Sequence, residues 1–159
     1  MEEQIIIRNA KNEDFEQVHE LIMQVHKLHV KERSDVYKNV DPLRFEEFKE
    51  ELLKSDSIYL VAEIDDKVVG SCFSQIKEIC NNKIMKDKRV LHINEICVDK
   101  NLQKRGIGKK LYNQIVQIAK EKNIYNIELM VWGFNKEAIK FYEKLDMNVK
   151  NMRFEQKIQ

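Results

Sequence analysis

The sequence predicts a mixed α/β sheet in a single domain over residues 1–159, with its elements in the order β-α-α-β-β-β-α-β-α-β. Two observations support this prediction. Segments with alternating or continuous apolar residues are interleaved with segments whose apolar residues recur every three or four positions. The length suits one domain with a sizeable core, and only four glycines and one proline interrupt the patterns. We see no internal repeat and no linker.

The first half of the chain is expected to contain a strand, two helices and a hairpin. Three consecutive isoleucines are β-branched and favour a first strand. Asn12 is placed to cap the first helix, and Asp41-Pro42 is placed to start the second, with proline in its first turn. The expected ranges are strand 4–8, strands 58–64 and 68–76, and a hairpin turn at 65–67.

The second half is expected to alternate strands and helices after a polar loop. Apolar residues at 107, 111, 115 and 118 share one face of a long helix, which Asn123 can end. The tail alternates as a strand, but its phase changes between 149 and 152, so we expect a bend or bulge there. The expected ranges are loop 77–88, strand 90–98, connection 99–105, helix 106–122, strand 124–132 and a short helix after Asn135.

Composition excludes several classes of protein. Lys and Arg number 28 and Asp and Glu 27, a balance that argues against a strong nucleic-acid binder. The three cysteines are an odd number without metal-ligand spacing, which predicts free thiols in a reducing, cytoplasmic setting. No signal peptide is recognisable, and the apolar runs are far shorter than the ~20 residues that span a membrane.

Two of the four glycines, Gly106 and Gly108, lie where a strand is expected to pass into a helix. The start of a helix leaves backbone N–H groups free and carries the positive end of the helix dipole, so it can bind an anion. Glycine lets a phosphate approach the backbone. The segment indicates a phosphate-bearing ligand; the alternative is a tight turn with solvated lysines. The basic side chains around it are Lys104, Arg105, Lys109 and Lys110.

Two other phosphate motifs do not fit this segment. A Walker loop needs a hydroxyl residue after the lysine, whereas Lys109 is followed by Lys110. A dinucleotide fingerprint needs a third glycine or alanine, and Leu111 occupies that position. A small nucleotide-binding protein is therefore a weaker interpretation.

A second motif follows the next expected strand. Gln103, Gly106 and Gly108 fit [Q/R]-x-x-G-x-[G/A], and the run from Asn135 through Ala138 to Phe141-Tyr142 fits N-x-x-A-x-x-F-Y. With both motifs in this order, the chain resembles the GCN5-related N-acetyltransferases over nearly its whole length. The family often continues with Gly-Phe where this chain has Asp146-Met147, which puts the local turn geometry in question.

The resemblance implies a GNAT-like acyl-CoA N-acyltransferase fold and transfer of an acetyl group from acetyl-CoA to a primary amine. In this family a bulge in the fourth strand separates it from the fifth and opens a slot for the cofactor. Backbone groups of the fourth strand would pair with the pantetheine arm, N–H groups of the glycine segment would hold the pyrophosphate, and Asn135 would help fix the arm. The implied cofactor-binding residues are Ile96, Cys97, Val98, Gln103, Lys104, Arg105, Gly106, Ile107, Gly108, Lys109, Asn135, Ala138 and Tyr142.

The chemistry needs a proton donor and a base. An alkylamine has a pKa of about 10.4 and must lose a proton before it attacks, so direct attack in a ternary complex needs position and a base but no covalent intermediate. In the resembling family, the position of Tyr142 donates a proton to the leaving thiolate. The alternative is a core tyrosine, since Ala138 and Leu145 lie one turn away on either side.

Glu95 and His92 are the candidate bases. Strict alternation places Glu95 on the apolar face of its strand, beside Ile93 and Cys97. A carboxylate there is costly unless it is paired or wet, so Glu95 is either a site residue, turned into the slot by the expected bulge, or part of an ion pair. His92 has a suitable ordinary pKa and is the second candidate. A water chain could replace either.

Other chemistry-bearing residues are expected to have structural roles. His26 and His29 are three residues apart, but nothing completes a metal site around them. His29 is expected on a packed face or in the acceptor pocket. Cys97 is expected to be an inert buried thiol, and Trp132 a core residue.

The acceptor is not determined by the sequence. The first two helices and loop 77–88 are expected to shape its pocket, and Glu95, Glu32 or Asp35 would suit a cationic amine. A polyamine, an aminoglycoside, an amino acid, a protein N-terminus and a lysine side chain remain open. The alternative function is a non-catalytic, regulatory module that binds CoA or acetyl-CoA. Dimers through the last strands are common in families of this kind, so a homodimer is compatible with the sequence.

Overall fold

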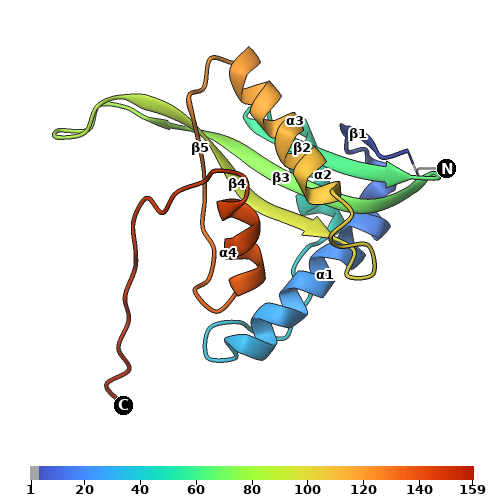
Figure 1. Cartoon of the computed structure of the whole chain (residues 1–159), viewed down its shortest axis with the longest axis horizontal. Coiled ribbons are helices and arrows are strands. Elements are labelled where there is room, and N and C mark those ends of the chain that lie inside the picture. Colours follow the sequence, from blue (N-terminus) through green and yellow to red (C-terminus); the bar gives the residue numbers. More distant parts are fainter. Residues whose placement is uncertain (1–3) are drawn as a thin grey trace.

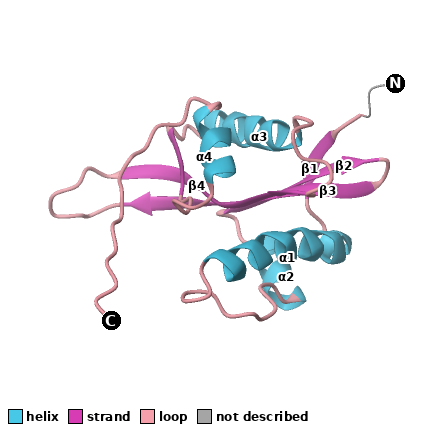
Figure 2. Cartoon of the chain, turned by 60° about the horizontal axis from the view of Figure 1, so that its bottom comes forward, coloured by secondary structure: helices cyan, strands magenta, loops and turns pink. Residues whose placement is uncertain are grey.

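The computed structural model describes residues 4–159, which form a five-stranded sheet with α-helices on both faces (Figure 1). The helices α3 and α4 lie on one face of the sheet, and α1 and α2 lie on the other (Figure 2). The elements are β1 Ile6–Asn9, α1 Phe15–Glu32, α2 Phe45–Leu53, β2 Ser57–Ile64, β3 Lys67–Ile79, β4 Lys88–Val98, α3 Ile107–Glu121, β5 Asn126–Leu129 and α4 Lys136–Glu143.

The sheet is mixed, as predicted. Its order is β1-β2-β3-β4-β5, with antiparallel neighbours up to β4 and a parallel pair of β4 and β5. The parallel pair needs a crossover, which α3 provides. The predicted hairpin turn is confirmed: Ile64 pairs with Lys67, and Asp65 and Asp66 between them have φ of 48° and 61°. Two successive positive φ values are typical of the turn that matches strand twist.

Two apolar clusters fill the space between the sheet and its helices. One packs α3 against the sheet, and the other packs α1 and α2 against the opposite face. Burial of these side chains gives most of the driving force for the fold. The first cluster includes Leu91, Ile93, Ile107, Leu111 and Ile115, and the second includes Val18, Leu21, Phe48, Val61 and Cys97.

The starts of α1 and α2 differ from the prediction. Asn12 does not cap α1; it lies in a short 3-10 helix, and Asp14 is the N-cap residue. Asp41 does not start α2, because its Oδ1 accepts a hydrogen bond from the N–H of Leu43 at 3.0 Å and forms a local turn. The helix begins only at Phe45. Asx side chains compete with helix geometry in this way.

Strand lengths differ as well. Loop 77–88 is shorter than predicted, because β3 continues to Ile79 and β4 starts at Lys88. β5 ends at Leu129 and not at residue 132, because its pairing with β4 stops there. Asn123 ends α3 with φ of 54°, as predicted.

The predicted last strand, with its bulge, is wrong: no strand follows α4 in the part of the chain that the structure describes. An extended segment becomes a strand only where another backbone satisfies its N–H and C=O groups, and no strand of the sheet pairs with residues 147–159. Ion pairs hold this tail instead, between Glu155 and Arg33 at 2.8 Å and between Lys157 and Asp35 at 3.3 Å. Its exposed apolar side chains are Val149, Met152, Phe154 and Ile158.

Candidate active site

A β-bulge interrupts β4 at Asn94. The pairing of β3 with β4 shifts between Phe73 and Ser74 and leaves Asn94 as the extra residue. On its other edge, β4 pairs with β5 only as far as Ile93 and Leu129. Beyond this pair, the β5-side edge of β4 has no strand partner within the described residues. The expected bulge and the slot between the two strands are therefore present.

The bulge reverses the faces of the residues that follow it. Ile93 packs in the α3 cluster, and so do Ile96 and Val98. Cys97 packs in the α1–α2 cluster. Strict alternation, which places Glu95 and Cys97 beside Ile93, is therefore wrong. One extra residue shifts the period of two, so Glu95 shares with Cys97 the face that α1 and α2 cover.

Glu95 is a poorly solvated carboxyl group. Burial raises its pKa to about 7, and a hydrogen bond with the Cys97 thiol opposes this only in part. No lysine, arginine or histidine within the described residues forms an ion pair with Glu95, so the structure gives no support to the ion-pair alternative. A carboxyl group with a pKa near 7 can both take up and release a proton at neutral pH.

Tyr142 lies on α4 and faces the same region. Burial raises the pKa of its hydroxyl above the ordinary value, and the charges of Cys72, Cys97 and Glu95 add to the rise. The hydroxyl therefore keeps its proton at neutral pH. No hydrogen bond from another described residue holds it, so it is available to a bound molecule. Helix α4 and strand β4 thus bring Tyr142 and Glu95 within electrostatic reach of one another.

Asn135 positions α4. Its side-chain Oδ1 accepts a hydrogen bond from the N–H of Ala138 at 3.1 Å, so Asn135 caps the helix, as predicted. The cap fixes the start of the helix that carries Tyr142. The asparagine side chain therefore has a structural partner, and its role toward a ligand arm stays a prediction.

His92 lies before the bulge and faces β5. Its Nδ1 is buried without a hydrogen-bond partner and lies 3.8 Å from Glu128 Oε1, too far for a hydrogen bond. Burial, together with the charge of Lys77, lowers the pKa of His92. Glu128 in turn pairs with Lys150 at 2.5 Å. His92 is thus directed toward a carboxylate of the neighbouring strand.

Different structural features explain why glycine occurs at positions 106 and 108. Gly106 is the N-cap of α3 with φ of 83°, a conformation that other residues adopt only with strain. Gly108 lies in a tight contact, because a β-carbon there would lie 3.1 Å from Cζ of Phe141 on α4 and the ring would have to move slightly. The close approach of α3 and α4, and not only an approach of phosphate to the backbone, thus explains the second glycine.

The start of α3 can hold an anion. The N–H groups of Ile107, Gly108 and Lys109 have no acceptor within the helix. Gln103 Nε2 donates to the carbonyl of Val98 at 3.5 Å, which joins this loop to the end of β4. Lys104 lies 3.9 Å from Glu137 and is largely exposed. An open strand edge that leads to a helix start fits a ligand with an extended amide arm and a pyrophosphate, as in CoA.

Sequence reasoning missed an aromatic cluster next to the slot. Trp132 Nε1 donates a hydrogen bond to the Tyr37 hydroxyl at 2.7 Å, and Tyr37 stacks on His29 with ring centroids 5.0 Å apart. Phe134 lies beside Trp132, 6.2 Å between centroids. Trp132 is therefore half-buried in contact with the α1–α2 connection. The signal in the sequence was one aromatic residue, Tyr37, in the connection between the two expected helices.

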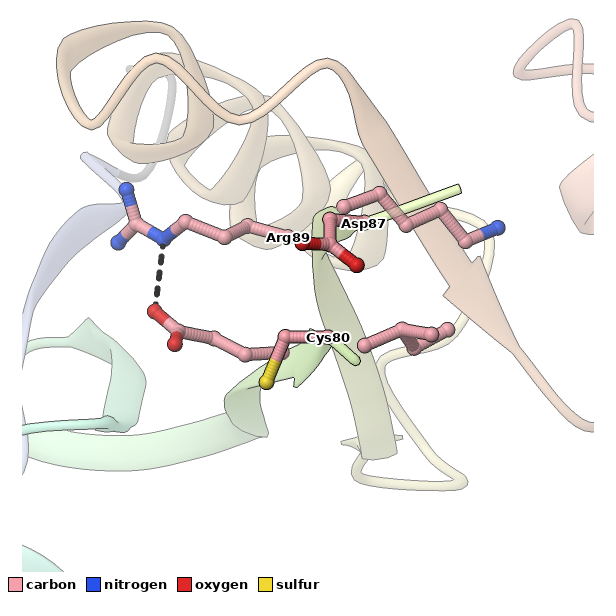
Figure 3. A pocket seen from close by; sticks show the side chains of 6 residues that line it. Cys80, Asp87 and Arg89 are labelled. Carbon is pink, nitrogen blue, oxygen red and sulfur yellow. Dashed lines mark ion pairs between the residues drawn. The ribbon is translucent and has the colours of Figure 1, made fainter. Parts of the chain in front are cut away.

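A separate depression lies between the ends of β3 and β4 (Figure 3). Its charged residues include Glu78 and Arg89, which pair with each other at 3.2 Å. None of the candidate site residues lines it. Within residues 4–159, no three His, Cys, Asp or Glu side chains are grouped as metal ligands, and no helix is long and apolar enough to cross a membrane.

The fold and the slot define a class of protein, and sequence comparison agrees. Residues 22–147 match the model of the acetyltransferase (GNAT) family, so the chain belongs to the GNAT family of N-acetyltransferases. An uncharacterized N-acetyltransferase of Methanocaldococcus jannaschii is 32% identical over 105 residues, which are 66% of this chain and 45% of the relative. The chain thus spans less than half the length of this curated relative.

Solved structures share the fold. A mutant of the BH1408 protein from Bacillus halodurans is 29% identical and superposes with a TM-score of 0.95, over 97% of this chain and 99% of the other. An aminoglycoside N-acetyltransferase in complex with CoA is 16% identical, with a TM-score of 0.78 over 100% and 98% of the two chains. The second likeness concerns the fold alone.

Proposed function

We propose that this chain is an acetyl-CoA-dependent N-acetyltransferase that moves the acetyl group to a primary amine by direct attack in a ternary complex. The observation that carries the proposal is the slot between β4 and β5, which opens at the bulge beside Glu95 and faces Tyr142. Membership of the GNAT family supports the cofactor, and a structure with the same fold binds CoA.

The cofactor would lie along the slot. The backbone of Ile96–Val98 would pair with the pantetheine arm, since no described strand pairs with this edge of β4. The loop and helix start at residues 103–109 would hold the pyrophosphate through N–H groups and nearby lysines. Acetyl-CoA supplies the activated acetyl thioester.

Glu95 would act as the general base and Tyr142 as the general acid. Glu95 would take a proton from the acceptor ammonium, directly or through water, because its pKa of about 7 suits a base at neutral pH. As the N–C bond forms and the C–S bond breaks, Tyr142 would give its hydroxyl proton to the leaving sulfur. His92 is the second candidate base, but its Nδ1 faces Glu128.

The acceptor would enter from the side of α1 and α2, since Glu95 faces these helices. A primary amine is the class that the family implies, and an aminoglycoside is the acceptor class in the name of one relative of the same fold. A screen therefore includes an aminoglycoside, a polyamine, a free amino acid, a peptide with a free N-terminus and an N-blocked lysine peptide.

Two measurements test the function. Acetyl-CoA at 100 times its dissociation constant should stabilise the fold by about 2.7 kcal/mol, which corresponds to a rise in Tm of about 5–10 °C. Release of free thiol from acetyl-CoA should then depend on one class of amine in the screen. No rise in Tm with millimolar acetyl-CoA contradicts the proposal. Clear binding without turnover on any amine favours the non-catalytic module.

A further inference from the structure

The loop between α1 and α2, residues 33–44, is joined to the slot through Tyr37. Tyr37 accepts the hydrogen bond from Trp132 Nε1 on one side, and its ring stacks on His29 at an interplanar angle of 24° on the other. Trp132 belongs to the connection from β5 to α4, which also carries Asn135 and leads to Tyr142. Tyr37 thus bridges the end of α1 and the wall of the slot opposite β4.

Two further histidines of α1 contact the same loop. His19 Nε2 lies 2.9 Å from Asp41 Oδ1, an ion pair that strengthens when His19 is protonated. His26 Nε2 lies 3.0 Å from the carbonyl oxygen of Lys38. A proton on Nε2 makes this hydrogen bond in both the neutral ring and the cation. Neither of these contacts involves Tyr37 or Trp132.

His29 differs from these two histidines in its surroundings. It is half-buried between Tyr37 and Phe134, and burial, followed by the nearby charge of His26, lowers its pKa. No carboxylate within the described residues pairs with it. The other cation in this cluster is Arg33, which lies 4.6 Å from the Trp132 ring centroid.

The two carboxylates that pair with Arg33 are already engaged. Arg33 is bonded to Asp35 and Glu155, and Asp35 also pairs with Lys157. A proton on His29 would therefore add an unpaired positive charge to a cluster that already holds Arg33 beside Trp132.

We propose that neutral His29 holds Tyr37 against Trp132, and that protonation of His29 releases this part of the α1–α2 loop while His19 still holds Asp41. This inference rests on the proposed function, in which the loop borders the acceptor side of the slot. His29 and Tyr37 are then positioning residues for the acceptor, and the acceptor side loosens as the pH falls.

The sign of the pH dependence follows from the lowered pKa. In the released loop His29 has its ordinary pKa of about 6.5, and in the closed loop its pKa is lower. The stability of the closed loop relative to the released loop is therefore greatest above pH 6.5 or so. It declines as the pH falls from this value toward the lowered pKa of His29.

Trp132 is the one tryptophan of the chain and reports on this contact directly. We would titrate its emission maximum and its quenching by acrylamide from about pH 8 to about pH 5, with far-UV circular dichroism as a check on the fold. The expected result is a red shift and stronger quenching at low pH, with unchanged circular dichroism. His29→Gln should remove this transition, and the matched control His19→Gln should keep it.

A transition that persists in His29→Gln, or no transition in the wild type, overturns the inference. Should His29→Gln not fold, Tyr37→Phe decides: it removes the acceptor of the Trp132 hydrogen bond, so its Trp132 should already be quenched strongly at high pH and show no further transition as the pH falls. A low-pH transition that persists in Tyr37→Phe overturns the inference. CoA binding, measured at both ends of the titration, separates the two proposals. Failure to bind CoA counts against the proposed function, whereas binding without a Trp132 response counts only against the loop.

Discussion

Gly108 and Phe141 mark a close approach of α3 and α4. A β-carbon at position 108 would lie 3.1 Å from Cζ and 3.4 Å from Cε2 of the Phe141 ring. This contact joins the helix whose start faces the expected pyrophosphate to the helix that carries Tyr142. A shift of the helix start at Gly108 would therefore also shift α4, which carries Tyr142.

The glycines around the slot should differ in what they tolerate. Gly108→Leu should destabilise the fold by about 1–3 kcal/mol through overpacking and should weaken CoA binding, because Phe141 has to move. Gly106→Ala should cost about 1–2 kcal/mol from its φ of 83°. Urea denaturation and CoA titration measure both effects.

The chain offers matched controls for this series. At Gly133 a β-carbon meets no atom within 4 Å, so Gly133→Ala should leave both measurements unchanged. Gly106→Asn should be milder than Gly106→Ala, since asparagine tolerates the left-handed conformation. Equal costs at positions 106, 108 and 133 would contradict the structural reasons given for each glycine.

Tyr142→Phe should lower kcat by about 100-fold or more while the Kd of CoA hardly changes, since general acid catalysis contributes on this scale. The phenyl ring keeps the packing of the half-buried side chain. Stopped-time assays of thiol release, with an acceptor from the screen, measure the effect. Tyr125→Phe is the control, because Tyr125 is 90% exposed. An unchanged kcat in Tyr142→Phe removes this residue from the mechanism.

Glu95 should set the acidic limb of the pH–rate profile. Its pKa is about 7, so kcat/KM should rise as the pH increases through about 7, where the carboxylate form appears. Glu95→Gln should lower the rate and flatten this limb. Retention of the limb in Glu95→Gln would point to His92 or another group as the base.

The same residue should reduce stability at alkaline pH. The carboxyl group is more acidic in the unfolded chain than in the fold, so its contribution to stability is present below its ordinary pKa and is lost as the pH rises to about 7. At pH 8 or so, Glu95→Gln should therefore be more stable than the wild type, by up to about 3 kcal/mol. Urea denaturation at acidic and alkaline pH tests this: a gain of equal size at both would contradict burial as the cause.

Replacing Asp146 by glycine should increase the free energy of unfolding. Its φ is 61°, the left-handed conformation that the resemblance to the family had put in question. Asp146→Gly should stabilise the fold by about 0.5–1 kcal/mol, because the strain of the side chain is relieved. Lys144 is the control: it has φ of −68°, so Lys144→Gly should destabilise. Thermal unfolding measures both, and a destabilised Asp146→Gly would contradict strain at this turn.

Most of the sheet and helices could be predicted from local patterns. The interleaving of strands and helices, the Asp65-Asp66 turn and the Asn135 cap depend on residues within a few positions of one another. Their spacing in the sequence therefore carries the information. The same holds for Gly106 and Gly108, whose place between a strand and a helix was visible in the motif.

The face occupied by Glu95 could not be predicted in this way. It depends on one extra residue, Asn94, and the position of a bulge is decided by the pairing of β4 with β3 and not by β4 itself. The prediction of a strand in the tail was wrong for a related reason. Its alternation is real, but no strand among residues 4–159 pairs with it, and ion pairs to Arg33 and Asp35 hold it instead.

The sequence by itself determined the succession of elements, the helix start with its two glycines and the two motifs of the family, because these are properties of short stretches of chain. Only the tertiary structure decided that Glu95 turns toward α1 and α2, that Gly108 packs closely against Phe141 and that Tyr37 contacts His29 and Trp132. These relationships join residues that are far apart in the chain, and packing of the sheet and helices sets them.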